Sequence, residues 1–217
     1  MQNNTLELVF ILDKSGSMQP LTDDTIGGFN SNLEKHREDD CKVLVTTVLF
    51  DSDFSVIHDR IPISEVPPLT AREYNAYGST ALYDAVGSTI RHIEDVHRYI
   101  RKEDVPEAVL FIIITDGMEN ASREFYGSQV RSMVEAKKEL GWDFVFVGAG
   151  IDAFQGARDI GISERASRSR ARSKAGMGQI MREASMMMDY GILKARREAP
   201  CATVDDYMEE NIKIEDD

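Results

Sequence analysis

The sequence has few cysteines, no long apolar run and no excess of positive charge. It contains two cysteines, Cys41 and Cys201, among 217 residues, which is too few for a disulfide framework and typical of a reducing compartment. No stretch approaches the ~20 consecutive apolar residues of a membrane-spanning helix. The first residues, MQNNTLEL, lack the basic and apolar regions of a signal peptide. These absences predict a cytoplasmic protein without a membrane anchor.

The net charge of −13 argues against a nucleic-acid-binding protein, because phosphate groups are attracted by a positive field. The glycine-rich motifs G-x-G-x-x-G and G-x-x-x-x-G-K-[ST] are also absent, which argues against nucleotide binding. The length and a hydrophobic content of 42% suit one α/β domain with its own core. We expect this domain to cover residues 1–197 and an acidic C-terminal tail, mobile or partner-binding, to cover 198–217.

Apolar runs and amphipathic stretches alternate along the chain. The order predicts an α/β, doubly wound fold, with a mostly parallel sheet, one antiparallel edge strand and helices on both faces. The antiparallel strand follows from the short turn at 51–53, which allows only a hairpin. Gly27 and Gly28, inside the first helix, predict a close approach of that helix to the sheet. The predicted strands are 6–12, 41–50, 54–61, 109–115 and 142–147, and the predicted helices are 20–38, 82–100, 128–141, a short one from 152 to 161, and 177–191.

Small oxygen-bearing side chains follow or precede these elements at three places. Asp13, Ser15 and Ser17 follow the first predicted strand, and Asp116 follows the most apolar one. Thr80 lies directly before the helix 82–100, where a plain helix cap is the alternative interpretation. Ligands of open α/β sheets bind at the carboxyl ends of strands. Carboxylate and hydroxyl oxygens, without a thiol or imidazole, favour hard cations such as Mg²⁺ or Mn²⁺.

The three motifs D-x-S-x-S at 13–17, G-x-T at 78–80 and T-D-G at 115–117 occur in an order that resembles the von Willebrand factor type A family. In that family they form the metal-ion-dependent adhesion site, and all five motif positions match. The resemblance covers roughly residues 5–195 and implies the same architecture with about six strands. The sequence departs from the pattern at the final strand, 167–172, which is unusually polar.

The resemblance implies a function as well as a fold. Ser15, Ser17 and Thr80 would contact Mg²⁺ directly, with Mn²⁺ or Ca²⁺ as further candidates, and Asp13 and Asp116 would act largely through bound waters. An open coordination position would then take an Asp or Glu carboxylate from a partner protein. Cytoplasmic bacterial single-domain members of the family often act as adaptors beside separately encoded partners, such as AAA+ ATPases or stress-response proteins. No bond is broken in such a role, so we expect a binding module and not an enzyme.

Two other functions remain open at this point. A metal-dependent phosphohydrolase would use two aspartates at strand ends with Mg²⁺, although it would want a second aspartate where Ser15 stands and a positioned lysine, for which Lys14 is the nearest candidate. An RNA- or stress-complex-associated adaptor would use the basic stretch 164–174, for which a charged edge strand is the favoured interpretation. We expect His92 and His97 to lie on a solvated helix face and the turn at Asp51 and Asp53 to be solvated, without metal.

Overall fold

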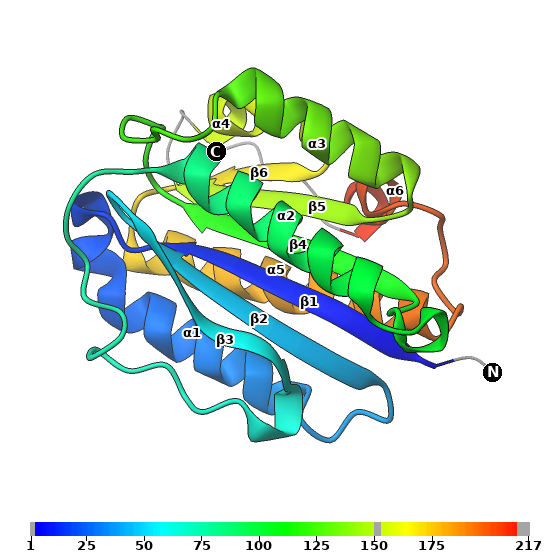
Figure 1. Cartoon of the computed structure of the whole chain (residues 1–217). Coiled ribbons are helices and arrows are strands. Elements are labelled where there is room, and N and C mark those ends of the chain that lie inside the picture. Colours follow the sequence, from blue (N-terminus) through cyan, green and yellow to red (C-terminus); the bar gives the residue numbers. More distant parts are fainter. Residues whose placement is uncertain (1–2, 150–152, 212–217) are drawn as a thin grey trace.

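The computed structural model describes residues 3–149 and 153–211, and its centre is a six-stranded sheet in the order β3-β2-β1-β4-β5-β6 (Figure 1). Neighbouring strands are parallel except β2 and β3, which form an antiparallel hairpin at one edge. The predicted fold class is therefore confirmed. The strands are β1 (Thr5–Asp13), β2 (Lys42–Phe50), β3 (Phe54–Pro62), β4 (Ala108–Thr115), β5 (Asp143–Ala149) and β6 (Ser167–Arg170).

Helices cover both faces of this sheet. In Figure 1, α1 and α5 lie behind the sheet and α2 lies in front of it, with α3 beside α2. Strands β1 and β4 are buried along their whole length, as expected for apolar strands covered on both sides. The helices are α1 (Thr22–Lys35), α2 (Leu82–Tyr99), α3 (Gly127–Glu139), α4 (Ala153–Asp159), α5 (Lys174–Ala195) and α6 (Val204–Asn211), with short 3₁₀ turns at Gly16–Leu21, Ile63–Glu65 and Lys102–Asp104.

The first helix differs from its prediction in two respects. A 3₁₀ turn containing Pro20 precedes α1, so the regular helix begins at Thr22. Gly28 allows a close approach, but to helix α5 and not to the sheet: a Cβ atom there would lie 2.2 Å from Cγ of Met181. Gly27 faces open space, with nothing within 4 Å of its Cβ position. The glycine pair therefore serves helix–helix packing, and only Gly28 is needed for it. The predicted helix start at Asp152 lies outside the described residues.

The carboxylate of Glu7, near the start of β1, is buried. Its Oε2 accepts a hydrogen bond from Nε of Arg60 at 2.8 Å and lies 3.2 Å from Nε2 of His97. The His97 side chain is only 11% exposed and packs edge-to-face against Trp142. The prediction of a solvated histidine was therefore wrong for His97. The buried carboxylate of Glu7 on β1 requires polar partners, and His97 of α2 is one of them.

Part of the predicted acidic tail packs against the domain. Val204 and Met208 of α6 are 2% and 0% exposed, and the ring of Tyr207 lies 4.9 Å from that of Tyr190 on α5. Residues 204–211 are thus held by apolar contacts, while the domain boundary at residue 197 stays a prediction. Within the described part of the chain, no helix is both long enough and apolar enough to cross a membrane.

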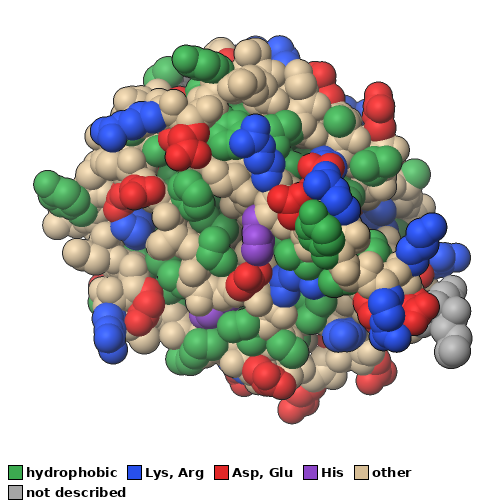
Figure 2. All heavy atoms as spheres, in the orientation of Figure 1, with side chains coloured by type: hydrophobic (Ala, Val, Ile, Leu, Met, Phe, Trp, Pro, Cys, Tyr) green, Lys and Arg blue, Asp and Glu red, His purple; other side chains and the backbone are tan. Residues whose placement is uncertain are grey.

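The basic stretch 164–174 contains the edge strand β6, as predicted, but its arginines turn toward their own chain. Arg168 is 4% exposed and donates to the backbone carbonyl of Met208 at 3.0 Å. Arg170 pairs with the buried Glu183 of α5. Figure 2 shows acidic and basic side chains interspersed over the face that it displays, without a large area of one sign. These contacts do not favour a nucleic-acid surface built on this stretch.

Candidate metal site

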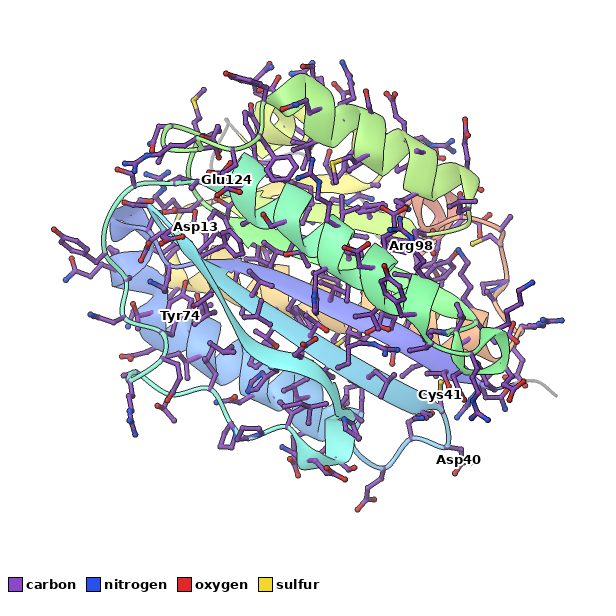
Figure 3. The ribbon with its side chains drawn as sticks, viewed as in Figure 1. Asp13, Asp40, Cys41, Tyr74, Arg98 and Glu124 are labelled. Atoms are coloured by element: carbon purple, nitrogen blue, oxygen red, sulfur yellow. The ribbon has the colours of Figure 1, made fainter. Side chains whose placement is uncertain are left out.

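The five predicted site residues lie at the carboxyl ends of two neighbouring strands and at the start of a helix. Asp13 ends β1, Asp116 follows β4, and these two strands are adjacent and parallel. Ser15 Oγ and Ser17 Oγ are 3.1 Å apart, and Ser17 Oγ donates to Oδ1 of Asp116 at 2.5 Å. Figure 3 shows Asp13 at the end of the sheet where Glu124 also lies, far from Asp40 and Cys41. Two chain segments separated by about a hundred residues therefore meet through side-chain oxygens.

The backbone of Gly117 shows how closely these oxygens converge. An ideal Cβ atom at this position would lie 3.1 Å from Thr80 Oγ1, 3.6 Å from Ser17 Oγ and 3.8 Å from Asp13 Oδ2. One point in space beside the third loop is thus within 4 Å of oxygens from the other two loops. Only a residue without a side chain leaves this space open, which explains the glycine after Asp116.

Backbone hydrogen bonds hold the Thr80 loop against the first loop. The Gly16 amide donates to the Gly78 carbonyl at 3.0 Å, and the Tyr77 amide donates to the Lys14 carbonyl at 2.8 Å. Gly78 has a φ of +81°, a left-handed conformation that favours glycine. These backbone contacts therefore fix the position of Thr80. The N-cap residue of α2 is Ala81, so the alternative interpretation of Thr80 as a plain helix cap is not confirmed.

Asn120 fixes Thr80 from the other side. Its side-chain Oδ1 accepts a hydrogen bond from the backbone amide of Thr80 at 2.9 Å, and its backbone amide donates to the Thr80 carbonyl at 3.0 Å. Asn120 lies four residues after Asp116, so the same loop supplies Asp116 and supports Thr80. The contact between the two residues can be seen only in the structure, because they are 40 positions apart in the sequence.

Asp13 is completely buried, with 0% exposure. Its Oδ1 accepts from the Ser15 amide at 2.6 Å and its Oδ2 from Thr115 Oγ1 at 2.5 Å, while the Tyr74 hydroxyl donates to its backbone carbonyl. Burial raises the pKa of the Asp13 carboxyl to about 6, against the opposing effect of these hydrogen bonds. Thr115 and Tyr74 are supporting residues that the sequence analysis missed, although Thr115 is part of the T-D-G motif.

Two further acids fasten the Asp116 loop to the start of α2. The Asp84 carboxylate accepts from the amides of Arg123, Glu124 and Phe125 at 2.7 to 2.9 Å. The Glu119 carboxylate accepts from the amides of Tyr83, Ala121 and Ser122. Because these carboxylates accept hydrogen bonds from backbone amides, they stabilise the conformation of the loop. Their role leaves Asp13 and Asp116 as the acids that face the convergence point.

The donor set fits a divalent cation that prefers oxygen. Two hydroxyls and one carboxylate lie within 4 Å of the convergence point, and Ser17 connects them to the Ser15 hydroxyl and the Asp116 carboxylate. Oδ2 of Asp116 is buried without a hydrogen-bond partner among the described residues. The cationic group beside this oxygen in the structure is the guanidinium of Arg172, whose Nε lies 3.2 Å away. The fit to a divalent cation therefore rests on the donor set, since hydroxyl and carboxylate oxygens are the ligands that hard cations prefer. Within the described ranges, no group of three or more His, Cys, Asp or Glu side chains forms a metal cluster. Three of the five ligands proposed for the candidate site are Ser and Thr hydroxyls, which are not among these four residue types.

Lys14 and the turn at 51–53 have a structural role beside the site. Lys14 pairs with Asp51, and Ser52 Oγ accepts from the Ser79 amide at 2.9 Å. The turn therefore supports the Thr80 loop. Because Lys14 is engaged with Asp51, the positioned lysine that a phosphohydrolase would need is not available from this residue.

No protein-family model matches the sequence, and no curated protein matches it either. Several solved structures share the fold. The manganese-loaded TRAP protein of Plasmodium vivax is 18% identical, with a TM-score of 0.59 over 88% of this chain and 75% of that one. The von Willebrand factor domain of the pilus tip protein Mfa5 from Porphyromonas gingivalis is 8% identical, with a TM-score of 0.62 over 86% of this chain and 96% of that one.

Proximal thread matrix protein 1 from the mussel byssus is 16% identical, with a TM-score of 0.53 over 85% of this chain. The chain spans less than half of the length of that protein, 46%. The same mussel protein is also known with zinc in its metal-ion-dependent adhesion site (MIDAS) motif. That structure gives a TM-score of 0.55 and 15% identity over 84% of this chain and 45% of that one. These likenesses establish that the chain has the fold of von Willebrand factor type A domains.

Proposed function

We propose that this chain is a member of the von Willebrand factor type A family and acts as a metal-dependent protein-interaction module. It would bind one divalent cation among Asp13, Ser15, Ser17, Thr80 and Asp116 and capture an Asp or Glu side chain of a partner protein. The observation that carries this proposal is the close approach of the Thr80, Ser17 and Asp13 oxygens to the Gly117 position, together with the hydrogen bond from Ser17 to Asp116. The manganese in the Plasmodium vivax protein and the zinc in the mussel protein support a divalent cation.

Each side chain has a defined part in this proposal. Ser15, Ser17 and Thr80 supply neutral oxygens to the cation, and Asp13 and Asp116 orient the hydroxyls and balance the charge. Neutral direct ligands would leave the bound cation electron-poor. The metal would then attract a carboxylate to its open coordination position. The hydrogen bond from Ser17 to Asp116 supports this division, because the carboxylate already holds the hydroxyl in place.

The proposed partner is a protein that presents an exposed acidic side chain, and the proposed compartment is the cytoplasm. Capture of a carboxylate involves no covalent step, so the proposed role is not enzymatic. Cys41 and Cys201 are both free thiols, which supports a reducing compartment. Mg²⁺ is the proposed ion in the cell, because it is a hard cation that accepts hydroxyl, carboxylate and water oxygens.

The proposal can be tested with Mn²⁺ as the probe and two short peptides that differ only in one residue, Glu or Gln. Water-proton relaxation reports how many waters remain on the protein-bound Mn²⁺. We expect the Glu peptide to displace water from Mn²⁺ on the wild-type protein and the Gln peptide not to do so. Thr80→Ala should bind no Mn²⁺ while keeping its circular dichroism spectrum. Equal effects of the two peptides would overturn carboxylate capture, and unchanged Mn²⁺ affinity in Thr80→Ala would overturn the site assignment.

A further inference from the structure

A cationic side chain from outside the three motif loops contacts the candidate site. Arg172 lies between β6 and α5, and its Nη2 donates to the backbone carbonyl of Asp116. Its Nε is 3.2 Å from Oδ2 of Asp116. The Asp116 side chain is 0% exposed and the Arg172 side chain 52% exposed. The guanidinium thus lies over a buried carboxylate, with about half of its own surface open to solvent.

The loop that carries Arg172 is held in one conformation. The Ser173 amide donates to the Ala171 carbonyl at 2.8 Å, and Ser173 Oγ accepts from the Gly176 amide at 3.1 Å. A Cβ atom at Gly176 would lie 1.9 Å from the Ala171 carbonyl oxygen, so the turn packs directly on the first turn of α5. On the strand side, Arg170 is fastened to Glu183. Arg172 is therefore presented to Asp116 by a fixed backbone, and only its own side chain is free to move.

The oxygen that Arg172 approaches belongs to a carboxylate whose charge would balance a bound cation. Oδ1 of Asp116 accepts from Ser17, while Oδ2 has no hydrogen-bond partner within the described residues. A guanidinium and a divalent cation beside the same carboxylate repel one another and compete for its charge. Because Nη2 is bonded to the backbone carbonyl and not to the carboxylate, the side chain can release Oδ2 and stay attached to the loop.

We propose that Arg172 is a built-in competitor for the metal ion: its guanidinium holds Asp116 Oδ2 and must yield this oxygen when a divalent cation binds. Arg172 then lowers the affinity of the site for cations, and the protein exchanges an internal ion pair for a metal. This inference rests on the proposed metal site. It distinguishes Arg172 from Arg168 and Arg170 of the same stretch, which bind a backbone carbonyl and Glu183 away from the metal position.

The test compares Mn²⁺ affinity by calorimetry in the wild type, Arg172→Gln and the control Arg101→Gln. Arg101 carries the same charge but pairs with Glu103 and Asp104 beyond the far end of α2. We expect Arg172→Gln to bind Mn²⁺ about tenfold more tightly than the wild type, and Arg101→Gln to match the wild type.

Two other outcomes would overturn the proposal, and they can be told apart. Equal affinity in all three proteins would show that Arg172 does not compete, while leaving the metal site intact. No binding in any of them would overturn the metal site itself. Melting temperatures provide a second measurement. Arg172→Gln should lower the melting temperature in EDTA, and this decrease should be smaller at saturating Mn²⁺, because the metal then balances the charge of Asp116. A loss of equal size in both buffers would mean a purely structural ion pair.

Discussion

Replacing Asp13 by asparagine should stabilise the protein in EDTA while it removes metal binding. Asp13 is fully buried, and burial raises its pKa from 3.8 to about 6. At neutral pH the folded protein must therefore keep an ionised carboxylate in an environment that favours the neutral acid. An asparagine has nearly the same shape and carries no charge. Its oxygen can still accept from the Ser15 amide, and its amide group can donate to the Thr115 hydroxyl.

The magnitude follows from the size of the pKa shift. A shift from 3.8 to about 6, at about 1.4 kcal/mol for each pKa unit, means that ionised Asp13 costs the folded state about 3 kcal/mol. In this range the folded protein binds more protons than the unfolded chain, so stability falls as the pH rises from about 4 to about 6 and is level above that. The gain from Asp13→Asn should be near zero at about pH 4 and reach about 1 to 3 kcal/mol at about pH 7.5.

Urea unfolding of both proteins in EDTA, at these two pH values, measures the difference directly. The reasoning would be refuted if Asp13→Asn were no more stable than the wild type at about pH 7.5, or if its gain were equally large at about pH 4. A calorimetric titration with Mn²⁺ completes the test, since Asp13→Asn should bind no ion. A stabilised protein without metal affinity would identify Asp13 as a residue kept for binding at the expense of stability.

Three further substitutions test the packing around the site and the chain end. Gly117→Ala places a Cβ atom 3.1 Å from Thr80 Oγ1, so calorimetry should show Mn²⁺ affinity at least about tenfold weaker with the melting temperature nearly unchanged. Gly176→Ala, whose Cβ atom would lie 1.9 Å from the Ala171 carbonyl oxygen, should cost about 2 kcal/mol or more in urea unfolding. Met208→Ala should cost about 2 to 3 kcal/mol, whereas a tail free of the domain would lose nothing.

The sequence predicted the sheet well because its signals are local and strong. Strands β1 and β4 are nearly continuous apolar runs, and such runs can only be buried on both faces. The turn at 51–53 joins two strands too closely for anything but a hairpin. The polar strand β6 was harder to predict, because its burial depends on Arg168 reaching the carbonyl of Met208, which lies forty residues away.

The sequence predicted which residues form the candidate site, and this stays a prediction, but it did not predict the residues that support them. The motifs could be found because each is a short local pattern, and the oxygens of Asp13, Ser17 and Thr80 do lie near Gly117. The contacts of Asn120 with Thr80 and of Arg172 with Asp116 join residues that are 40 and 56 positions apart. Nothing in the local sequence marks such pairs. His97 was misplaced for the same reason, since its partner Glu7 is 90 residues distant.

The most direct test of the account is a calorimetric titration of Mg²⁺ and Mn²⁺ into the wild type and into Ser15→Ala. Ser15 is buried, with 1% exposure, and its hydroxyl lies 3.1 Å from that of Ser17. Removing this one oxygen should leave the fold intact, which circular dichroism would verify. The account predicts one bound ion for the wild type and none for Ser15→Ala. Equal binding by both proteins, or no binding by the wild type, would contradict the proposed metal site.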